Sequence, residues 1–270
     1  MLCEKMKTTS FWAALFLSAW FLLGSGALGQ TGGSQAATPQ RPTFTLDAST
    51  AAPGTMELEM GTASWRGFFA LPVFLRYTPN SSAGLLHQAE FGFAFDAVSS
   101  VGLGPDRMTE FGDRIGVVWR RPVYSSGPVA FAIAPTATFL LCGDEGARIG
   151  ATGIAAFGFG QNGAAVNAGW SSATNSSNSN PAYDYFVAAD FARTLGTSGA
   201  LSRLSPFAGI LYQDTTLDSA SVSLGQGVSY RVRPNWVFDL AVYEHGFSLG
   251  TRDYQVLVGF TVNLGRPGRW

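Results

Sequence analysis

Charged side chains recur at alternate positions within otherwise apolar stretches of this 270-residue chain. They are Glu57, Glu59, Arg76, Glu90, Asp96, Arg114, Arg120, Asp184, Asp190, Arg231 and Asp239. Around a water-filled channel, such a mixed lining determines which solutes pass. In a narrow, plugged lumen, the same arginines and carboxylates pair with one another and brace the wall. The sequence leaves these two interpretations open.

A second polar cluster, Glu244, His245 and Ser248, contains the residue types of a hydrolase that activates a serine. The His-x-x-Ser spacing does not match such a site, and the polarity of a loop accounts for these residues, so we predict no catalytic residue. The other histidine, His87, lies too far along the chain to complete a metal site. No phosphate-binding or dinucleotide-binding motif occurs in the sequence. We therefore expect neither a metal nor a cofactor.

The elements that must position these charges are strands, because polar and apolar residues alternate with a period of two. The pattern is clearest in residues 254–264, where every second side chain is apolar and the others are mostly small or polar. Residues 88–97 repeat it, with Phe93 on the apolar face and Glu90 on the other. The apolar face contacts lipid in a membrane barrel and fills the core in a secreted, soluble β-sandwich.

The composition favours the membrane barrel. Charged residues make up 13% of the chain, against about 25% in soluble proteins. Removal of an N-terminal signal leaves a single cysteine, Cys142, and hence no internal disulfide. A closed barrel pairs its backbone groups within the sheet and is stable in lipid without disulfides. The net charge of −1 gives no reason to expect nucleic-acid binding.

The order of sequence types along the chain predicts its organisation. Lys5 and Lys7 precede an apolar run and then small residues, which is the order of a cleaved secretory signal peptide. An uncleaved anchor is the alternative, but the run is short for a spanning helix. The next stretch is rich in Thr, Ser, Ala, Gly and Pro, as in a flexible linker. We predict a signal peptide over residues 1–29, a flexible periplasmic lead-in over 30–54, a barrel over 55–264 and a C-terminal tail over 265–270.

The barrel region has room for about twelve strands, each near the length of about 9 to 11 residues that crosses a bilayer obliquely. An even number places both termini on one side, which we take as the periplasm. Longer connections are then expected outside and tight turns inside. The outer connections are 99–111, 142–148, 172–182 and 246–251, and the inner turns include 161–163 and 233–235. The predicted fold class is an all-β, antiparallel transmembrane β-barrel.

Residues 111–121, FGDRIGVVWRR, resemble the Gly-Asp-x-x-x-Gly-x-(Lys/Trp)-(Tyr/Arg)-Arg strand of the outer-membrane transporter family named MetA-pathway of phenol degradation. Short stretches of the C-terminal half are similar to that family as well, at residues 228–231, 233–236, 238–239 and 258–261. The resemblance covers residues 55–264 and implies an outer-membrane β-barrel that passes small solutes, with aromatic compounds among the candidates. Such barrels usually end on an aromatic residue that the assembly machinery reads, whereas here the tail follows the closing strand and ends in Trp270.

These patterns lead to three functional hypotheses. We expect a bacterial outer-membrane channel for passive passage of small solutes, with membrane lipid, the solute and the outer-membrane assembly machinery as partners. One alternative is a non-conducting structural or adhesion barrel whose outer loops bind a partner. The other is a lipid-modifying barrel enzyme that uses Glu244, His245 and Ser248. Conductance after reconstitution distinguishes the channel from the non-conducting barrel.

Overall fold

The computed structural model describes residues 36–40, 43–65, 67–81, 84–101, 108–110, 114–140, 146–176, 181–216, 220–246 and 253–266. The predicted signal peptide lies outside these residues. The strands are β1 (Thr55–Trp65), β2 (Phe68–Thr78), β3 (Glu90–Val101), β4 (Met108–Glu110), β5 (Arg114–Ser126), β6 (Val129–Leu140), β7 (Ala147–Phe159), β8 (Asn162–Ala173), β9 (Tyr183–Arg193), β10 (Leu204–Thr215), β11 (Ser221–Arg233), β12 (Trp236–His245) and β13 (Asp253–Gly265). Two short 3₁₀ helices, η1 (Gly84–Leu86) and η3 (Leu201–Arg203), lie in connections. Within the described ranges, no helix has the length and apolarity needed to span a membrane.

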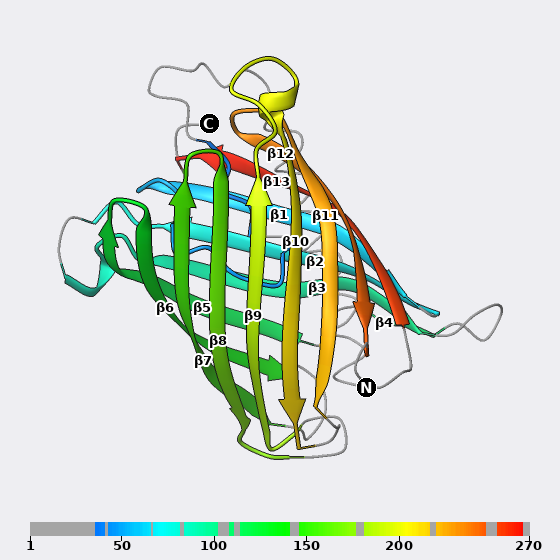
Figure 1. The fold of residues 1–270 in the computed structure, drawn as a ribbon. Helices are drawn as coiled ribbons and strands as arrows, with labels where there is room; N and C mark the ends of the chain where they lie inside the picture. Colours follow the sequence, from blue (N-terminus) through cyan, green and yellow to red (C-terminus); the bar gives the residue numbers. More distant parts are fainter. Residues whose placement is uncertain are drawn as a thin grey trace.

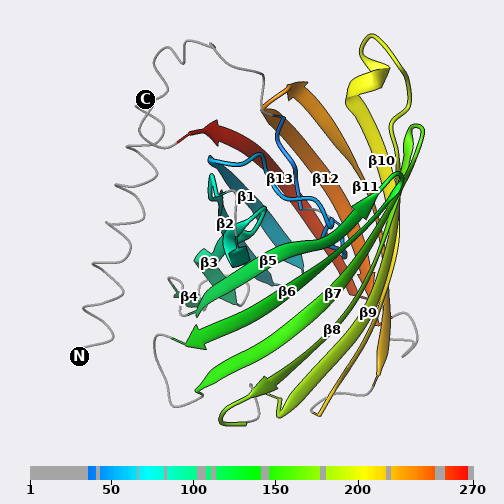
Figure 2. The same ribbon diagram turned by 90° about the vertical axis from the view of Figure 1, so that its left-hand side faces the viewer.

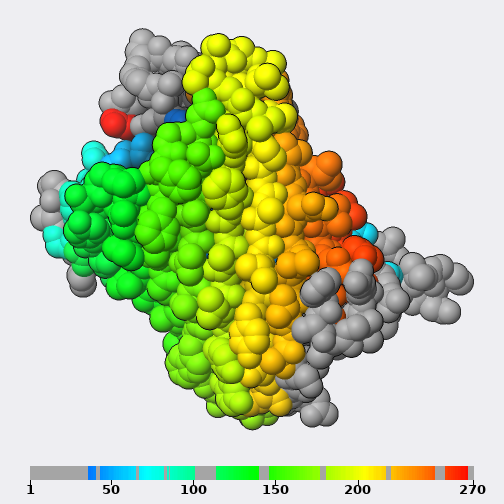
Figure 3. Space-filling view, viewed as in Figure 1, coloured from blue at the N-terminus to red at the C-terminus, as the bar shows by residue number. Residues whose placement is uncertain are grey.

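The strands close into an antiparallel barrel (Figures 1 and 2). Each long strand pairs with its neighbour along the chain, and β1 pairs with both β2 and β13, which joins the first strand to the last. The three-residue β4 pairs with the end of β3, and the wall, whose outer surface is seen in Figure 3, consists of the other twelve strands. The predicted fold class is therefore confirmed. β4 itself lies in a stretch predicted as a loop.

Side chains alternate between the two faces of the wall as the sequence predicts. In β3, the Phe93 side chain is 50% exposed on the outside, whereas that of Glu90 is 2% exposed on the inside. In β13, Val258 is exposed outside and Thr261 is buried inside. An apolar outer face and a polar inner face are the arrangement that a lipid bilayer requires of a barrel.

Pro72 shows how the wall accommodates a residue that cannot donate a ladder hydrogen bond. The sequence predicts that this proline interrupts its strand unless it lies at a bulge. The register between β2 and β3 shifts between Ala70 and Pro72, which is such an irregularity. The strand therefore continues to Thr78 and carries Arg76 into the barrel interior.

Tight turns gather at the end of the barrel where β1 begins and β13 ends, which we call the terminal end. The connections β5–β6, β7–β8 and β11–β12 there each contain two residues between strands. The glycines of the first two turns, Gly127 and Gly160, have positive φ values of 56° and 65°, a conformation that costs a glycine little. The β1–β2 connection at the opposite end is also short. The β2–β3 and β9–β10 connections at the terminal end are longer, with 11 and 10 residues, so the asymmetry of inner turns and outer loops stays a prediction.

The chain before β1 differs from its prediction. Residues 36–40 and 43–54, which we call the lumenal segment, run inside the barrel (blue in Figure 2) and bond to its inner wall. The Ala37 N–H donates to the Pro234 carbonyl at the terminal end (2.9 Å), and the Gly54 N–H donates to Thr78 (2.6 Å) at that same end. The segment therefore enters and returns through one opening, where a flexible periplasmic lead-in was expected.

Candidate functional site

Buried charges on the first strands form one network at the inner wall. Arg76 Nη2 lies 2.5 Å from both Glu57 and Glu59, and its Nη1 lies 3.3 Å from Glu90. Arg120 Nη2 lies 2.6 Å from the other oxygen of Glu90. Strand register brings these groups together, because Glu57 is directly opposite Arg76 and Glu90 is directly opposite Arg120. All five side chains are at most 3% exposed, so each charge depends on its partners rather than on water.

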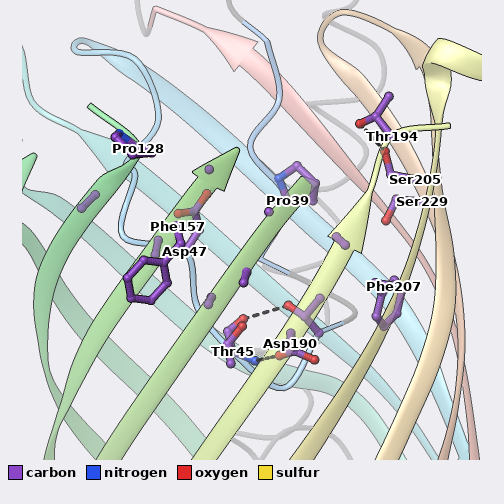
Figure 4. Close-up of a pocket in the computed structure, with 18 of the residues that line it drawn as sticks. Pro39, Thr45, Asp47, Pro128, Phe157, Asp190, Thr194, Ser205, Phe207 and Ser229 are labelled. Carbon is purple, nitrogen blue, oxygen red and sulfur yellow. Dashed lines mark hydrogen bonds between the residues drawn. The ribbon is translucent and has the colours of Figure 1, made fainter. Parts of the chain in front are cut away.

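The carboxylates of the wall also bind the lumenal segment. The donors are backbone N–H groups of the segment, which find these carboxylates as acceptors instead of the carbonyl groups of a helix or sheet. The donors and acceptors are Thr38 to Glu57 (3.1 Å), Gln40 to Glu59 (2.9 Å), Thr45 to Asp190 (2.6 Å, Figure 4) and Ala51 to Glu90 (3.1 Å). Hydrogen bonds to an ionised acceptor are stronger than neutral ones. The segment is thus held along most of its length.

The guanidinium groups bind the carbonyl groups of the same segment. Arg76 Nη2 donates to the Thr38 carbonyl (2.6 Å), and Arg120 Nη1 donates to the Asp47 carbonyl (2.8 Å). Arg120 Nη1 also donates to the Gln40 side chain at 2.5 Å. These two arginines therefore have two roles, because they neutralise wall carboxylates and anchor the segment.

Apolar contacts fix the segment against two sides of the lumen. The Phe44 ring stacks on Tyr243 of β12, with ring centroids 4.5 Å apart and planes inclined by 23°. Gly225 makes room for it, since a Cβ there would lie 2.8 Å from the Phe44 ring. Leu46 and Ala48 pack in a second cluster that includes Ile154 of β7. The segment therefore crosses the lumen from one side of the wall to the other.

Two lumenal cavities lie against the segment. The first has a volume of about 490 Å³ and is partly lined by hydroxyl groups, among them those of Ser205 and Ser229 (Figure 4), and by Arg231. The second, about 440 Å³, is mostly apolar and is lined by Phe74 and Val118 among others. Thr45 contributes to the first lining and Leu46 to the second, so consecutive residues of the segment face different cavities. The segment therefore forms part of the lining of both cavities.

Five of the eleven charges predicted to line the lumen belong to this network, and the other six lie elsewhere on the wall. Asp190 binds Thr45, and Arg231 Nη1 donates to the Ala37 carbonyl (3.3 Å) at the edge of the first cavity. Asp96 and Arg114 line the second cavity. Asp184 accepts from Gln213 (3.2 Å), and Asp239 is buried beside Gly259.

His245, which the enzyme hypothesis groups with Glu244 and Ser248, has two described hydrogen-bond partners on neighbouring strands. Ser248 lies outside the described residues. His245 Nδ1 is 3.1 Å from Ser223 Oγ, and its Nε2 is 3.0 Å from the Gln255 side-chain oxygen. Ser223 is buried within the wall, and the three residues share the inner face of adjacent strands, so strand parity was the signal that could have found them. Within the described ranges, no group of three side chains is suited to bind a metal ion.

The residues that sequence reasoning missed belong mostly to the segment and its seat: Gln40, Phe44, Leu46, Asn167 and Tyr243. Asn167 of β8 is buried and lies against Leu46. With its amide oriented to satisfy both groups, its nitrogen donates to the Leu46 carbonyl (3.2 Å) and its oxygen accepts from the Leu46 N–H (2.6 Å).

Comparisons with known proteins support the fold. No protein-family model matches the chain, and no curated protein does. Among solved structures, the NanC porin is similar with a TM-score of 0.53 and 7% identity, over 77% of this chain and 98% of that one. The KdgM porin is similar with a TM-score of 0.51 and 12% identity, over 76% of this chain and 98% of that one. The chain has the fold of outer-membrane porins, which agrees with the predicted outer-membrane location, and membership of the phenol-degradation family stays a prediction.

Proposed function

We propose that the protein is a bacterial outer-membrane channel for passive passage of small solutes, and that the lumenal segment closes it in the conformation described. The observation that carries this proposal is the pair of cavities, of about 490 and 440 Å³, that the segment lines. Each is large enough for a small-molecule ligand. Displacement of the segment joins them into one passage.

The charge network supports an open state that remains folded. When the segment leaves, Arg76 keeps its three carboxylate partners in the wall, and Arg120 keeps Glu90. Water entering the lumen replaces the backbone groups of the segment as donors and acceptors. The wall therefore does not depend on the segment to neutralise its arginines.

The solute class is proposed more broadly than the family resemblance implies. One of the similar structures is the KdgM porin in complex with disordered oligogalacturonate, so a porin of this fold has been observed with an acidic oligosaccharide. In this chain, the first cavity offers Ser205, Ser229 and Arg231, and the second offers Phe74 and Val118. We propose small polar solutes with limited apolar surface, and small aromatic solutes remain within that class.

Single-channel recording after reconstitution tests the proposal. We expect the full chain to open rarely and Phe44→Ala to raise the open probability, because the substitution removes the stacking contact with Tyr243. Ser49→Ala is the matched control, since Ser49 is exposed in the same segment and bonds to Asp47. Raised conductance in the control as well would point to general loosening instead of a gate.

The filled lumen also favours a second candidate, a non-conducting structural or adhesion barrel. In that case the network and the segment serve only to brace the wall. Both the full chain and Phe44→Ala would then be electrically silent while remaining folded in the membrane. Silence of both would exclude the proposed channel.

A further inference from the structure

The inner wall recognises the lumenal segment chiefly through its main chain. Carboxylates bind N–H groups at Thr38, Gln40, Thr45 and Ala51. Guanidinium groups bind carbonyl groups, and the Asn167 amide pairs with both backbone groups of Leu46. Such donors and acceptors are common to every peptide. The wall therefore offers charge-assisted partners to any peptide that follows the same path.

Side chains of the segment contribute fewer specific contacts. The Thr38 hydroxyl donates to Glu57 (2.8 Å), and the Gln40 side chain accepts from Arg120 (2.5 Å). The largest side-chain contact is the Phe44 ring, which lies between Tyr243 and the space left by Gly225. A Cβ at Gly225 would lie 2.6 Å from the Tyr243 ring as well, so the seat for this aromatic group requires the glycine.

From this geometry we infer that the lumen is a binding site for oligopeptides that carry an aromatic residue, occupied here by the chain's own segment as an intramolecular ligand. The inference rests on the proposed function, because a free peptide reaches the site only when the segment has left it. A covalently linked ligand has an effective concentration in the millimolar range. A free peptide therefore competes only when the segment is weakened.

The test uses the full chain with Gln40→Ala and Phe44→Ala, which removes two anchors of the segment and none of the wall. A fluorescent synthetic peptide with the sequence of residues 36–50, AATPQRPTFTLDAST, is titrated in detergent, and its anisotropy is recorded. We expect saturable binding to the weakened chain and at least ten-fold weaker apparent binding to the unaltered chain. Absence of saturable binding to the weakened chain, confirmed as folded by heat-modifiability, overturns the inference.

Two further peptides determine which chemical groups are recognised. One is N-methylated at Thr45, which removes the N–H that Asp190 accepts while leaving every side chain in place. We expect it to bind about ten-fold more weakly, since a hydrogen bond to a charged group is lost. The second keeps the phenylalanine in place but has the other residues scrambled. We expect its affinity to be within about three-fold of that of the unmodified peptide of residues 36–50. Loss of binding by the scrambled peptide would show that the segment is recognised by its sequence and not by its main chain.

A double-mutant cycle assigns the contact to the wall. Asp190→Ala should weaken binding of the unmodified peptide but have little further effect on the peptide N-methylated at Thr45. Val187→Ala, on the outer face of the same strand β9, is the matched control and should leave binding unchanged. Additive effects of Asp190→Ala and N-methylation would contradict the inferred contact.

Conductance separates failure of this inference from failure of the channel. If the peptide binds and blocks current through the weakened chain, both proposals hold. Binding without any current at any voltage excludes the channel and supports the peptide site. If the weakened chain conducts current but the peptide neither binds to it nor blocks the current, the channel is supported and the peptide site is excluded.

Discussion

Removal of the Arg76 charge tests the bracing role of the network most directly. Arg76 is fully buried and lies 2.5, 2.5 and 3.3 Å from Glu57, Glu59 and Glu90. In Arg76→Leu, Glu90 keeps Arg120, but Glu57 and Glu59 lose their guanidinium partner. Breaking a buried ion pair by removing one partner costs about 3–5 kcal/mol. Because two buried carboxylates lose this ion pair at once, while Glu57 keeps the neutral donor Asn263 (3.0 Å), we expect a loss at the upper end of that range.

The assay is urea unfolding in lipid vesicles, followed by the gel shift between folded and unfolded bands. Arg114→Leu is the matched control, since this arginine is exposed on the inner face of β5, and it should cost less than about 1 kcal/mol. Adding Glu57→Gln and Glu59→Gln to Arg76→Leu should recover much of the loss, because neutral amides are cheaper to bury than carboxylates. A loss below about 1 kcal/mol in Arg76→Leu would refute the buried network and indicate that water already reaches these charges.

Other substitutions test the outward orientation of Phe93, the site on β11 and β12 that holds Phe44, and the charge lining of the lumen. Phe93→Arg should lower the yield of insertion into vesicles, because a charge at mid-bilayer on the outer face of a barrel costs about 2–4 kcal/mol. The control Phe93→Leu should insert normally, and equal yields of the two variants would contradict the outward position of this residue. Gly225→Ala should raise conductance, because the new methyl group would lie 2.8 Å from the Phe44 ring and displace the segment. Gly153→Ala on the outer face is the control, and equal conductance of the two variants would argue against this packing of Phe44. Arg231→Gln should shift the reversal potential toward cation selectivity with little change in the free energy of unfolding. Arg120→Gln should chiefly lower the free energy of unfolding, because Arg120 pairs with buried Glu90. A loss of stability in both variants would show that neither charge lines an open pore.

The wall was predictable from the sequence because its signal is local. Period-two alternation in stretches such as residues 254–264 assigns each side chain to a face without knowledge of the neighbouring strand. That assignment places Glu90 on the buried inner face and Phe93 on the exposed outer face, as the structure has them. Register between strands is not local, so the direct opposition of Glu57 to Arg76 and of Glu90 to Arg120 could not be predicted.

The lumenal segment was missed for a different physical reason. Its main contacts use backbone N–H and carbonyl groups, which all residue types share, so composition could not distinguish it from a flexible linker. Two features of the sequence bore on it indirectly. Gly225 leaves space on the inner face, and the buried carboxylate of Asp190 needs a donor that no neighbouring strand residue provides in its described contacts. Both features acquire meaning only once the strands are arranged around a lumen.

The position of the lumenal segment directly before β1 also constrains how the barrel can assemble. Its partners are 19 residues away at Glu57 but 145 away at Asp190 and 194 away at Arg231. The nearby contacts form at low loop-closure cost, before the distant strands arrive. A sheet that curls around an already seated segment avoids threading Phe44 through a closed ring. The segment then acts as a template around which the strands of the wall assemble. Phe44→Ala should therefore slow the appearance of the folded band in a refolding time course, even if the free energy of unfolding changes little.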